Sequence, residues 1–150
     1  MSAKVELSLT GSMDYLRMVW QTGEALIEPL AFREDPEGTR YNVLLALQEM
    51  VTNVIRHAYQ GDEQNPISLE FEVDERRFLV VLKDRGKAFN PLAHKLSSEE
   101  LEEMPEQVGG YGIMIATMVM DEVSYQRENG WNKLTMCKMV DSLAPAKAQG

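Results

Sequence analysis

The fold of this chain is decided by one stretch, Leu45-Ala-Leu-Gln-Glu-Met-Val-Thr-Asn-Val-Ile-Arg-His-Ala-Tyr59. Glu49, Asn53 and His57 recur at four-residue steps, so at ~100° per residue they share one face of a helix, with Arg56 beside them. The opposite side carries a stripe of apolar residues, namely Leu44, Leu47, Val51, Val54, Ile55 and Ala58. The stripe predicts a core contact, and the polar line either faces a ligand or is a solvated helix face.

Composition narrows the classes of function. The 150 residues are 44% apolar and 26% charged, which suits one domain of a globular protein. A net charge of −9 argues against nucleic acid and anionic membrane surfaces as partners. One cysteine and two histidines argue against a disulfide framework and a zinc site. We see no signal peptide and no apolar run of about 18 residues, and therefore expect a cytoplasmic protein.

The other hydrophobic patterns predict the remaining elements. They are a strand at 5–9, a helix from Ser12 to about Pro29, the helix at 39–59, a hairpin of strands 67–73 and 77–82, a helix at 113–120 and a hairpin of strands 122–127 and 131–140. This order predicts an α+β fold, a two-layer sandwich whose mixed, mostly antiparallel sheet is covered by helices on one face. We expect a single domain over 1–150, a mobile acidic segment at about 90–108 and a frayed tail at 141–150.

Two glycine-containing motifs are candidates for ligand contact. Gly109-Gly-Tyr-Gly112 precedes an apolar helix, where free backbone amides favour an anion such as phosphate; a plain hinge is the alternative. Asp84-Arg-Gly86 follows a buried strand. A carboxylate there can accept a hydrogen bond from an exocyclic amine, and Gly86 leaves room for a flat ring against the backbone. An ordinary Asp-Gly turn is the alternative for this motif.

Taken together, the three motifs resemble the GHKL (Bergerat) ATP-binding fold of gyrase, MutL and histidine kinases. Within that group the chain is most similar to bacterial anti-sigma-factor serine kinases. The resemblance is carried by Leu47–Tyr59, by Val81-Leu-Lys-Asp-Arg-Gly-Lys-Ala-Phe-Asn-Pro91 and by Gly109-Gly-Tyr-Gly-Ile-Met-Ile115, and it extends over about 5–140.

The resemblance implies a role for each candidate residue. Asn53 would bind the Mg²⁺ that bridges the ATP phosphates, and Glu49 would be the general base. Asp84 would bind the adenine amino group. The rest of the implied ATP-binding set is Arg56 near the phosphates, Gly86 and Ala88 along the base, and Gly109, Gly110, Tyr111 and Gly112 around the phosphates, at the end of a lid formed by 90–108.

The resemblance also implies partners. Relatives of this kind phosphorylate a serine of a small anti-anti-sigma protein with the STAS fold, and as homodimers they bind a sigma factor. Two departures bear on activity: Ala88 replaces the second glycine of the usual Asp-x-Gly-x-Gly pattern, and Asn90 replaces an acidic residue. If position 88 needs a positive φ, alanine costs about 1 kcal/mol and weakens binding.

Two alternative functions stay open. The chain could be a non-catalytic ATP-binding module that sequesters a sigma factor or another regulator. It could also be a stand-alone ATPase domain that works with a separate histidine-bearing partner, as in two-component systems.

Overall fold

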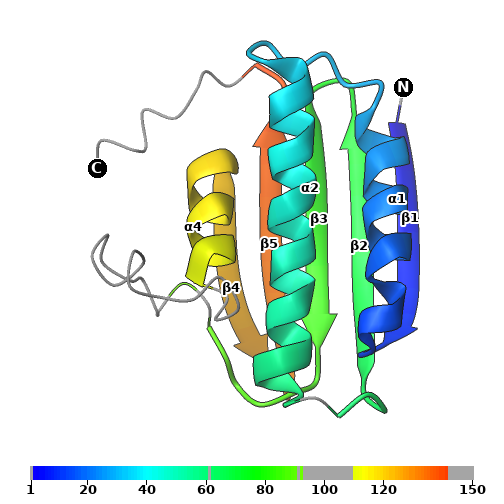
Figure 1. Ribbon diagram of the computed structural model, residues 1–150, viewed down its shortest axis with the longest axis vertical. Coiled ribbons are helices and arrows are strands. Elements are labelled where there is room, and N and C mark those ends of the chain that lie inside the picture. Colours follow the sequence, from blue (N-terminus) through cyan, green and yellow to red (C-terminus); the bar gives the residue numbers. More distant parts are fainter. Residues whose placement is uncertain (1, 61, 91, 93–109, 142–150) are drawn as a thin grey trace.

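One antiparallel sheet forms the base of the molecule in the computed structural model, which describes residues 2–60, 62–90, 92 and 110–141. Its strands are β1 (Ser2–Thr10), β2 (Pro66–Asp74), β3 (Arg77–Asp84), β4 (Glu122–Glu128) and β5 (Trp131–Met139). They lie in the order β1-β2-β3-β5-β4 (Figure 1). Every pairing among these strands is antiparallel, so the predicted mixed sheet is, in the described residues, purely antiparallel.

In the described part of the chain, α-helices cover one face of this sheet (Figure 1). They are α1 (Leu16–Ile27), α2 (Pro36–Asn53) and α4 (Gly110–Val119). A 3₁₀ turn, η1 (Met13–Tyr15), leads into α1, and Ser12 caps it by accepting a hydrogen bond from the Asp14 amide at 3.2 Å. The predicted α+β sandwich, with helices on a single face, is confirmed. No helix in the described part of the chain has both the length and the apolar character of a membrane span.

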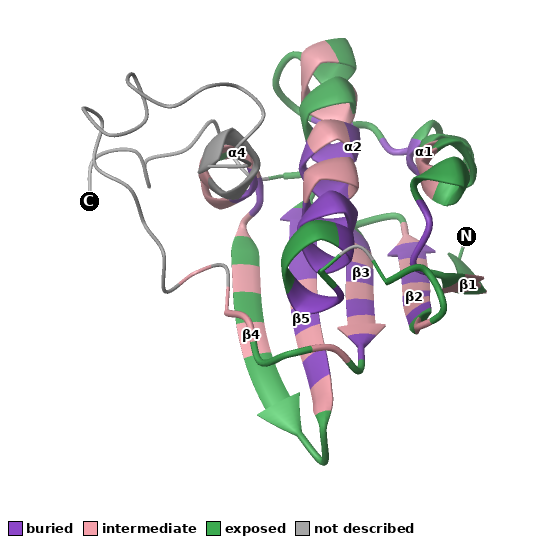
Figure 2. Cartoon of the chain, turned by 60° about the horizontal axis from the view of Figure 1, so that its bottom comes forward, coloured by how far each residue is buried: buried purple, intermediate pink, exposed green. Residues whose placement is uncertain are grey.

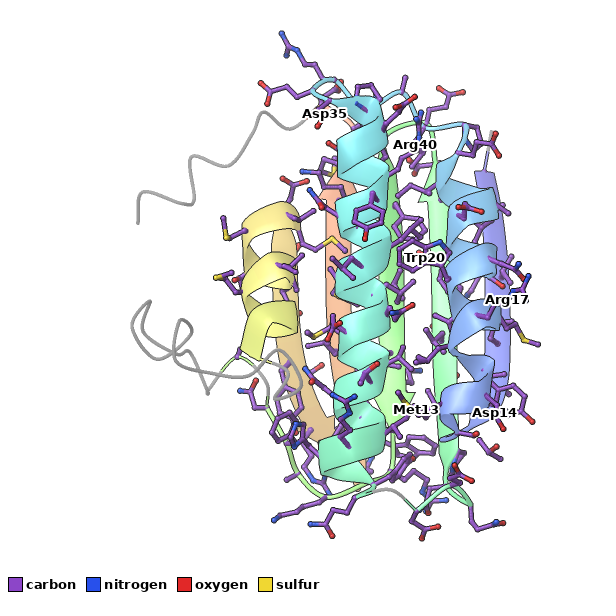
Figure 3. The ribbon with its side chains drawn as sticks, viewed as in Figure 1. Met13, Asp14, Arg17, Trp20, Asp35 and Arg40 are labelled. Atoms are coloured by element: carbon purple, nitrogen blue, oxygen red, sulfur yellow. The ribbon has the colours of Figure 1, made fainter. Side chains whose placement is uncertain are left out.

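The core lies between the two layers (Figure 2). Strand alternation was predicted correctly: Ile67, Leu69, Phe71 and Val73 of β2 are all at most 4% exposed. The predicted apolar stripe of α2 is buried as well. Near the outer surface of the helical layer, Trp20 of α1 meets Tyr41 of α2 edge to face, with ring centroids 5.8 Å apart (Figure 3). Helix α2 packs against α1 and lies in front of β3 and β5 (Figure 1).

Helix α2 differs from the prediction at both ends. It begins at Pro36, three residues earlier than expected, because Asp35 adopts a left-handed conformation and caps the amide of Gly38. Its last turn is a π-helical turn, η2 (Val54–Ala58), in which the Tyr59 amide donates to the Val54 carbonyl at 2.9 Å. Such a turn is wider than an α-turn, so the four-residue spacing no longer predicts the direction of residues beyond Asn53.

The glycine motif before α4 also differs from the prediction. The helix begins at Gly110 rather than at Ile113, so Gly110, Tyr111 and Gly112 form its first turn. Gly109 lies outside the described residues, as do 91 and 93–108 of the expected lid and 142–150 of the expected tail. The turn between β4 and β5 was predicted correctly, and its Asn129 and Gly130 have φ values of 53° and 82°.

Candidate functional site

A small cavity lies where the C-terminal end of α2 meets the ends of two strands. Asn53 of α2, Asp84 at the end of β3 and Asn132 at the start of β5 line it together. Apolar side chains, among them Met50 and Leu134, form the rest of its wall. Its volume of about 20 Å³ has room for a single water molecule. Two residues that the sequence singled out from separate motifs, Asn53 and Asp84, are thus brought to one place.

Asp84 is a buried carboxylate whose two oxygen atoms differ in their hydrogen bonds. It is 3% exposed, and its Oδ1 atom accepts hydrogen bonds from Asn132 Nδ2 at 2.8 Å and from the Gly86 amide at 2.9 Å. Within the described residues, its Oδ2 atom accepts no hydrogen bond. Burial raises the pKa of Asp84, while the bonds from Asn132 and Gly86 and the nearby charge of Arg127 oppose that rise. One carboxylate oxygen is therefore held by the protein, and the other is left for a ligand donor.

Asn53 is a buried amide with an unused donor. It is 4% exposed, and its Nδ2 atom has no hydrogen-bond partner among the described residues. An unpaired buried donor is costly, so this amide is suited to a polar ligand in the cavity. The amide oxygen is also a ligand type that Mg²⁺ accepts when phosphate oxygens complete its shell. The chemistry of this position therefore fits a hydrated magnesium ion bound together with phosphates.

The loop after β3 is held against the end of η2. A Cβ atom on Gly86 would lie 2.5 Å from the Ala58 carbonyl oxygen, and the Lys87 amide donates to that same oxygen at 2.8 Å. The Tyr59 hydroxyl accepts from the Arg85 amide at 2.8 Å and donates to the Pro66 carbonyl. The space at Gly86, which we expected to accommodate a flat ring, is thus occupied by the Ala58 backbone.

The remaining predicted residues of α2 and the β3 loop lie outside the cavity wall. Glu49 is one turn before Asn53 and half-buried, while Arg56 and His57 are exposed. The ring of His57 stacks on Phe89, with centroids 4.9 Å apart and planes at 18°, and Phe89 in turn lines the cavity. Ala88 is exposed. The predicted polar line is therefore divided, with Asn53 in the cavity wall and His57 stacked on Phe89, another residue of that wall.

Residues 110–112 of the glycine motif belong to a helix that packs beside α2 (Figure 1). Gly110, Tyr111 and Gly112 form the N-terminal turn of this helix, α4. The amides of such a turn have no partner within their own helix, which gives this end of α4 the chemistry of an anion site.

The sequence analysis missed Asn132 and the two residues that donate to it, Tyr125 and Arg127. Asn132 is 3% exposed, and its Oδ1 atom accepts from the Tyr125 hydroxyl and from Arg127 Nη1, the latter at 2.9 Å. A signal was available, because Asn132 is in phase with Leu134 and Met136 on the core-facing side of β5. A polar residue in that phase must find buried partners.

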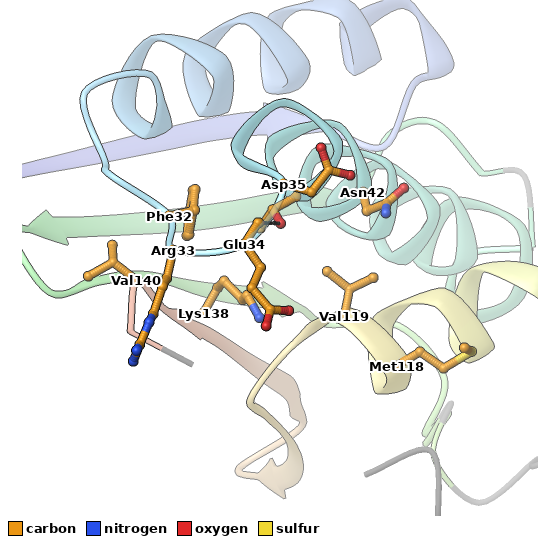
Figure 4. Close-up of a pocket in the computed structure, with 10 residues that line it drawn as sticks. Phe32, Arg33, Glu34, Asp35, Asn42, Met118, Val119, Lys138 and Val140 are labelled. Carbon is orange, nitrogen blue, oxygen red and sulfur yellow. Dashed lines mark hydrogen bonds between the residues drawn. The ribbon is translucent and has the colours of Figure 1, made fainter. Parts of the chain in front are cut away.

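A larger pocket lies at the opposite end of α2 (Figure 4). Its volume is about 280 Å³, and it is lined by Phe32, Asp35, Val119 and Lys138 among others. Lys138 Nζ lies 3.7 Å from Asp121 Oδ2. None of the predicted ATP-site residues lines this pocket. Volume alone therefore does not identify the candidate site; the convergence of Asn53, Asp84 and Asn132 does.

Comparison with known proteins agrees with this architecture. The histidine kinase-like ATPase domain family matches residues 21–138. The chain is 29% identical over 134 residues to the serine-protein kinase RsbW of Staphylococcus epidermidis, covering 84% of this chain and 80% of the relative. It is 28% identical over 134 residues to the serine/threonine-protein kinase BtrW of Bordetella bronchiseptica, covering 88% and 89%.

Two solved structures share the fold. The RsbU and RsbW domains of Rv1364c from Mycobacterium tuberculosis match with a TM-score of 0.58 and 16% identity, over 91% of this chain and 32% of that one. The histidine kinase domain of the Erythrobacter litoralis blue-light activated kinase EL346 matches with a TM-score of 0.51 and 15% identity, over 88% and 61%. These matches show that the chain shares the fold of these domains, one antiparallel sheet covered by helices on one face. The chain belongs to the histidine kinase-like ATPase domain family.

Proposed function

We propose that this protein is an ATP-dependent serine kinase that acts in the cytoplasm on a small STAS-type anti-anti-sigma protein and that, as a homodimer, binds a sigma factor. The observation that carries the ATP site is the convergence of Asn53 and Asp84 on one cavity. The similarity to proteins named serine-protein kinase, at 25–29% identity, supports the choice of reaction.

Each residue has a role in this proposal. Asp84 Oδ2 would accept a hydrogen bond from the adenine amino group, with Ala88 along the base. The amide oxygen of Asn53 would hold Mg²⁺, which when bound neutralises charge on the phosphates. Backbone amides at 109–112 would bind phosphate oxygens, with Arg56 nearby. Glu49 would take the proton of the attacking serine hydroxyl.

Binding of the base requires a change in the cavity. At about 20 Å³ it does not accommodate a purine ring, and Phe89 forms part of its wall. The loop that carries Phe89 would therefore move outward when nucleotide enters, while the Asp84–Asn132 pair stays in place.

The kinase reaction can be tested with the purified protein, labelled ATP, Mg²⁺ and a STAS-type partner. We expect phosphoserine on the partner, and we expect Glu49→Gln to lower the rate by about 100-fold or more, because general bases contribute at least that much. Glu37→Gln, at the exposed opposite end of α2, is the matched control. Full activity in Glu49→Gln would contradict the base assignment, and absence of phosphoserine would contradict the kinase proposal.

One observation favours the alternative of a non-catalytic ATP-binding module. Glu49 is half-buried and is not part of the cavity wall that holds Asn53 and Asp84. Under this alternative the protein binds ATP and a regulator tightly. The ATP is then recovered unchanged after prolonged incubation with the STAS-type protein and the sigma factor.

A further inference from the structure

We propose that Asn132 is a positioning residue that determines which nucleobase the site accepts, by holding Asp84 so that only one carboxylate oxygen faces the ligand. This inference rests on the proposed nucleotide site and extends it to a residue of β5 that no motif predicted. The base class that it selects is a purine with an exocyclic amino group, as opposed to one with an oxo group at the same position.

The orientation of the Asn132 amide is fixed by its partners. Nδ2 lies 2.8 Å from Asp84 Oδ1 and 3.0 Å from the Lys87 carbonyl oxygen. Both are acceptors, so the amino group of the amide must face them. On the other side, Arg127 Nη1 donates to Oδ1 at 2.9 Å, and arginine has no acceptor. A reversed amide would therefore break hydrogen bonds on both sides.

This orientation constrains Asp84. Its Oδ1 atom already accepts from Asn132 and from the Gly86 amide, which holds the plane of the carboxylate and leaves Oδ2 as the ligand-facing acceptor. The same network fixes the loop after β3, since Arg127 Nη1 also donates to the Gly86 carbonyl at 3.0 Å. A base that presents an amino group donates a hydrogen bond to Oδ2. A base that presents an oxo group brings two acceptors together, which is unfavourable.

Nucleobase preference is the quantity to measure. Calorimetric titrations with Mg²⁺-ATP and Mg²⁺-inosine triphosphate, which carries an oxo group in place of the amino group, give the ratio of the two Kd values. We expect the wild type to prefer ATP and Asn132→Ala to reduce that preference by about tenfold, the effect of losing one hydrogen bond to a charged group. Gln126→Ala, at an exposed position of the same hairpin, should keep the wild-type ratio.

A second variant keeps the test decisive if Asn132→Ala does not fold, as judged by thermal unfolding. Tyr125→Phe removes only the hydroxyl that donates to Asn132 Oδ1, and should reduce the preference by a smaller factor. Equal weakening of ATP and inosine triphosphate in the folded variants would assign Asn132 a purely structural role and overturn the inference. A wild type that binds neither nucleotide would instead refute the proposed function.

Discussion

Where β3 ends and β5 begins, two neighbouring residue pairs differ in burial and in hydrogen bonding. Asp84 lies opposite Asn132, and Lys83 lies opposite Lys133. The first pair is 3% exposed on both sides and joined by a hydrogen bond of 2.8 Å. The second is half-buried on the helix-free face, where Lys83 forms an ion pair of 3.8 Å with Glu70. One step along a strand therefore separates a buried polar pair from a pair that lines an open pocket on the helix-free face.

The difference shows what the helical layer contributes. Successive residues of a strand point to opposite faces of the sheet, so identical backbone geometry serves both pairs. Only the inner pair is desolvated by the end of α2 and the loop after β3, and burial there raises the pKa of Asp84. Substitutions on the inner face should therefore have large effects, and equivalent substitutions on the outer face should have small ones.

Gly86→Ala should have the largest effect. Its new Cβ atom would lie 2.5 to 2.8 Å from backbone and Cβ atoms of Ala58, so the loop must shift. We expect the free energy of unfolding to fall by about 3 kcal/mol, and nucleotide binding to weaken with it. Denaturant unfolding measures the free energy of unfolding, and calorimetry measures the Kd of the nucleotide. Lys87→Ala, which keeps its backbone bond to Ala58, is the control; equal stability of Gly86→Ala and wild type would contradict this packing.

Asp84→Asn should have an intermediate effect that depends on pH. Because burial raises the pKa of Asp84, the folded state binds more protons than the unfolded state between the ordinary value of about 3.9 and the raised value. The free energy of unfolding of the wild type therefore loses this contribution as pH rises through that window, and stays level above it. We expect Asp84→Asn to lack this decrease, and to lose base binding.

Denaturant unfolding of both proteins across that window measures the difference. Glu63→Gln, which removes an exposed carboxylate, should keep the wild-type pH dependence. The same pH dependence in Asp84→Asn and wild type would mean that Asp84 is ionised as easily in the folded chain as in the unfolded one.

Lys133→Ala on the outer face should have the smallest effect. It removes one of two like charges that lie opposite each other, which offsets the packing that the side chain loses. We expect the free energy of unfolding to change by at most about 0.5 kcal/mol and the nucleotide Kd to stay unchanged. Lys83→Ala, which also loses its ion pair with Glu70, should cost slightly more. If Lys133→Ala lowered the free energy of unfolding by more than about 1 kcal/mol, the expected difference between substitutions on the two faces would be contradicted.

Elements with a local periodic signal were predicted well. The alternation of β2 and the apolar stripe of α2 are confirmed, because each depends on residues that are neighbours along the chain. The turn at Asn129-Gly130 is confirmed for the same reason. The predicted start of α2 was wrong because Asp35 caps it in a left-handed conformation that no periodicity reports. The π-helical turn η2 was missed because the pattern assumed a constant rotation per residue.

The sequence predicted individual residues of the candidate site, but it did not predict which of them contact each other. Asn53 and Asp84 were singled out from two separate motifs, and both line the cavity. Gly86 was singled out as room for a flat ring, and the structure shows instead that its missing side chain admits the Ala58 backbone. The roles of Glu49, Arg56, Ala88 and residues 109–112 stay predictions that the proposed experiments test.

The sequence by itself determined the helices and strands, the fold family and the residue types available for nucleotide chemistry, because these follow from local spacing and composition. The tertiary structure decided which of those residues meet. Asn132 contacts Asp84 across 48 residues of sequence, through the pairing of β5 with β3. Only that pairing, under the cover of α2, buries both side chains, and burial is what makes their hydrogen bond and the free oxygen of Asp84 matter for function.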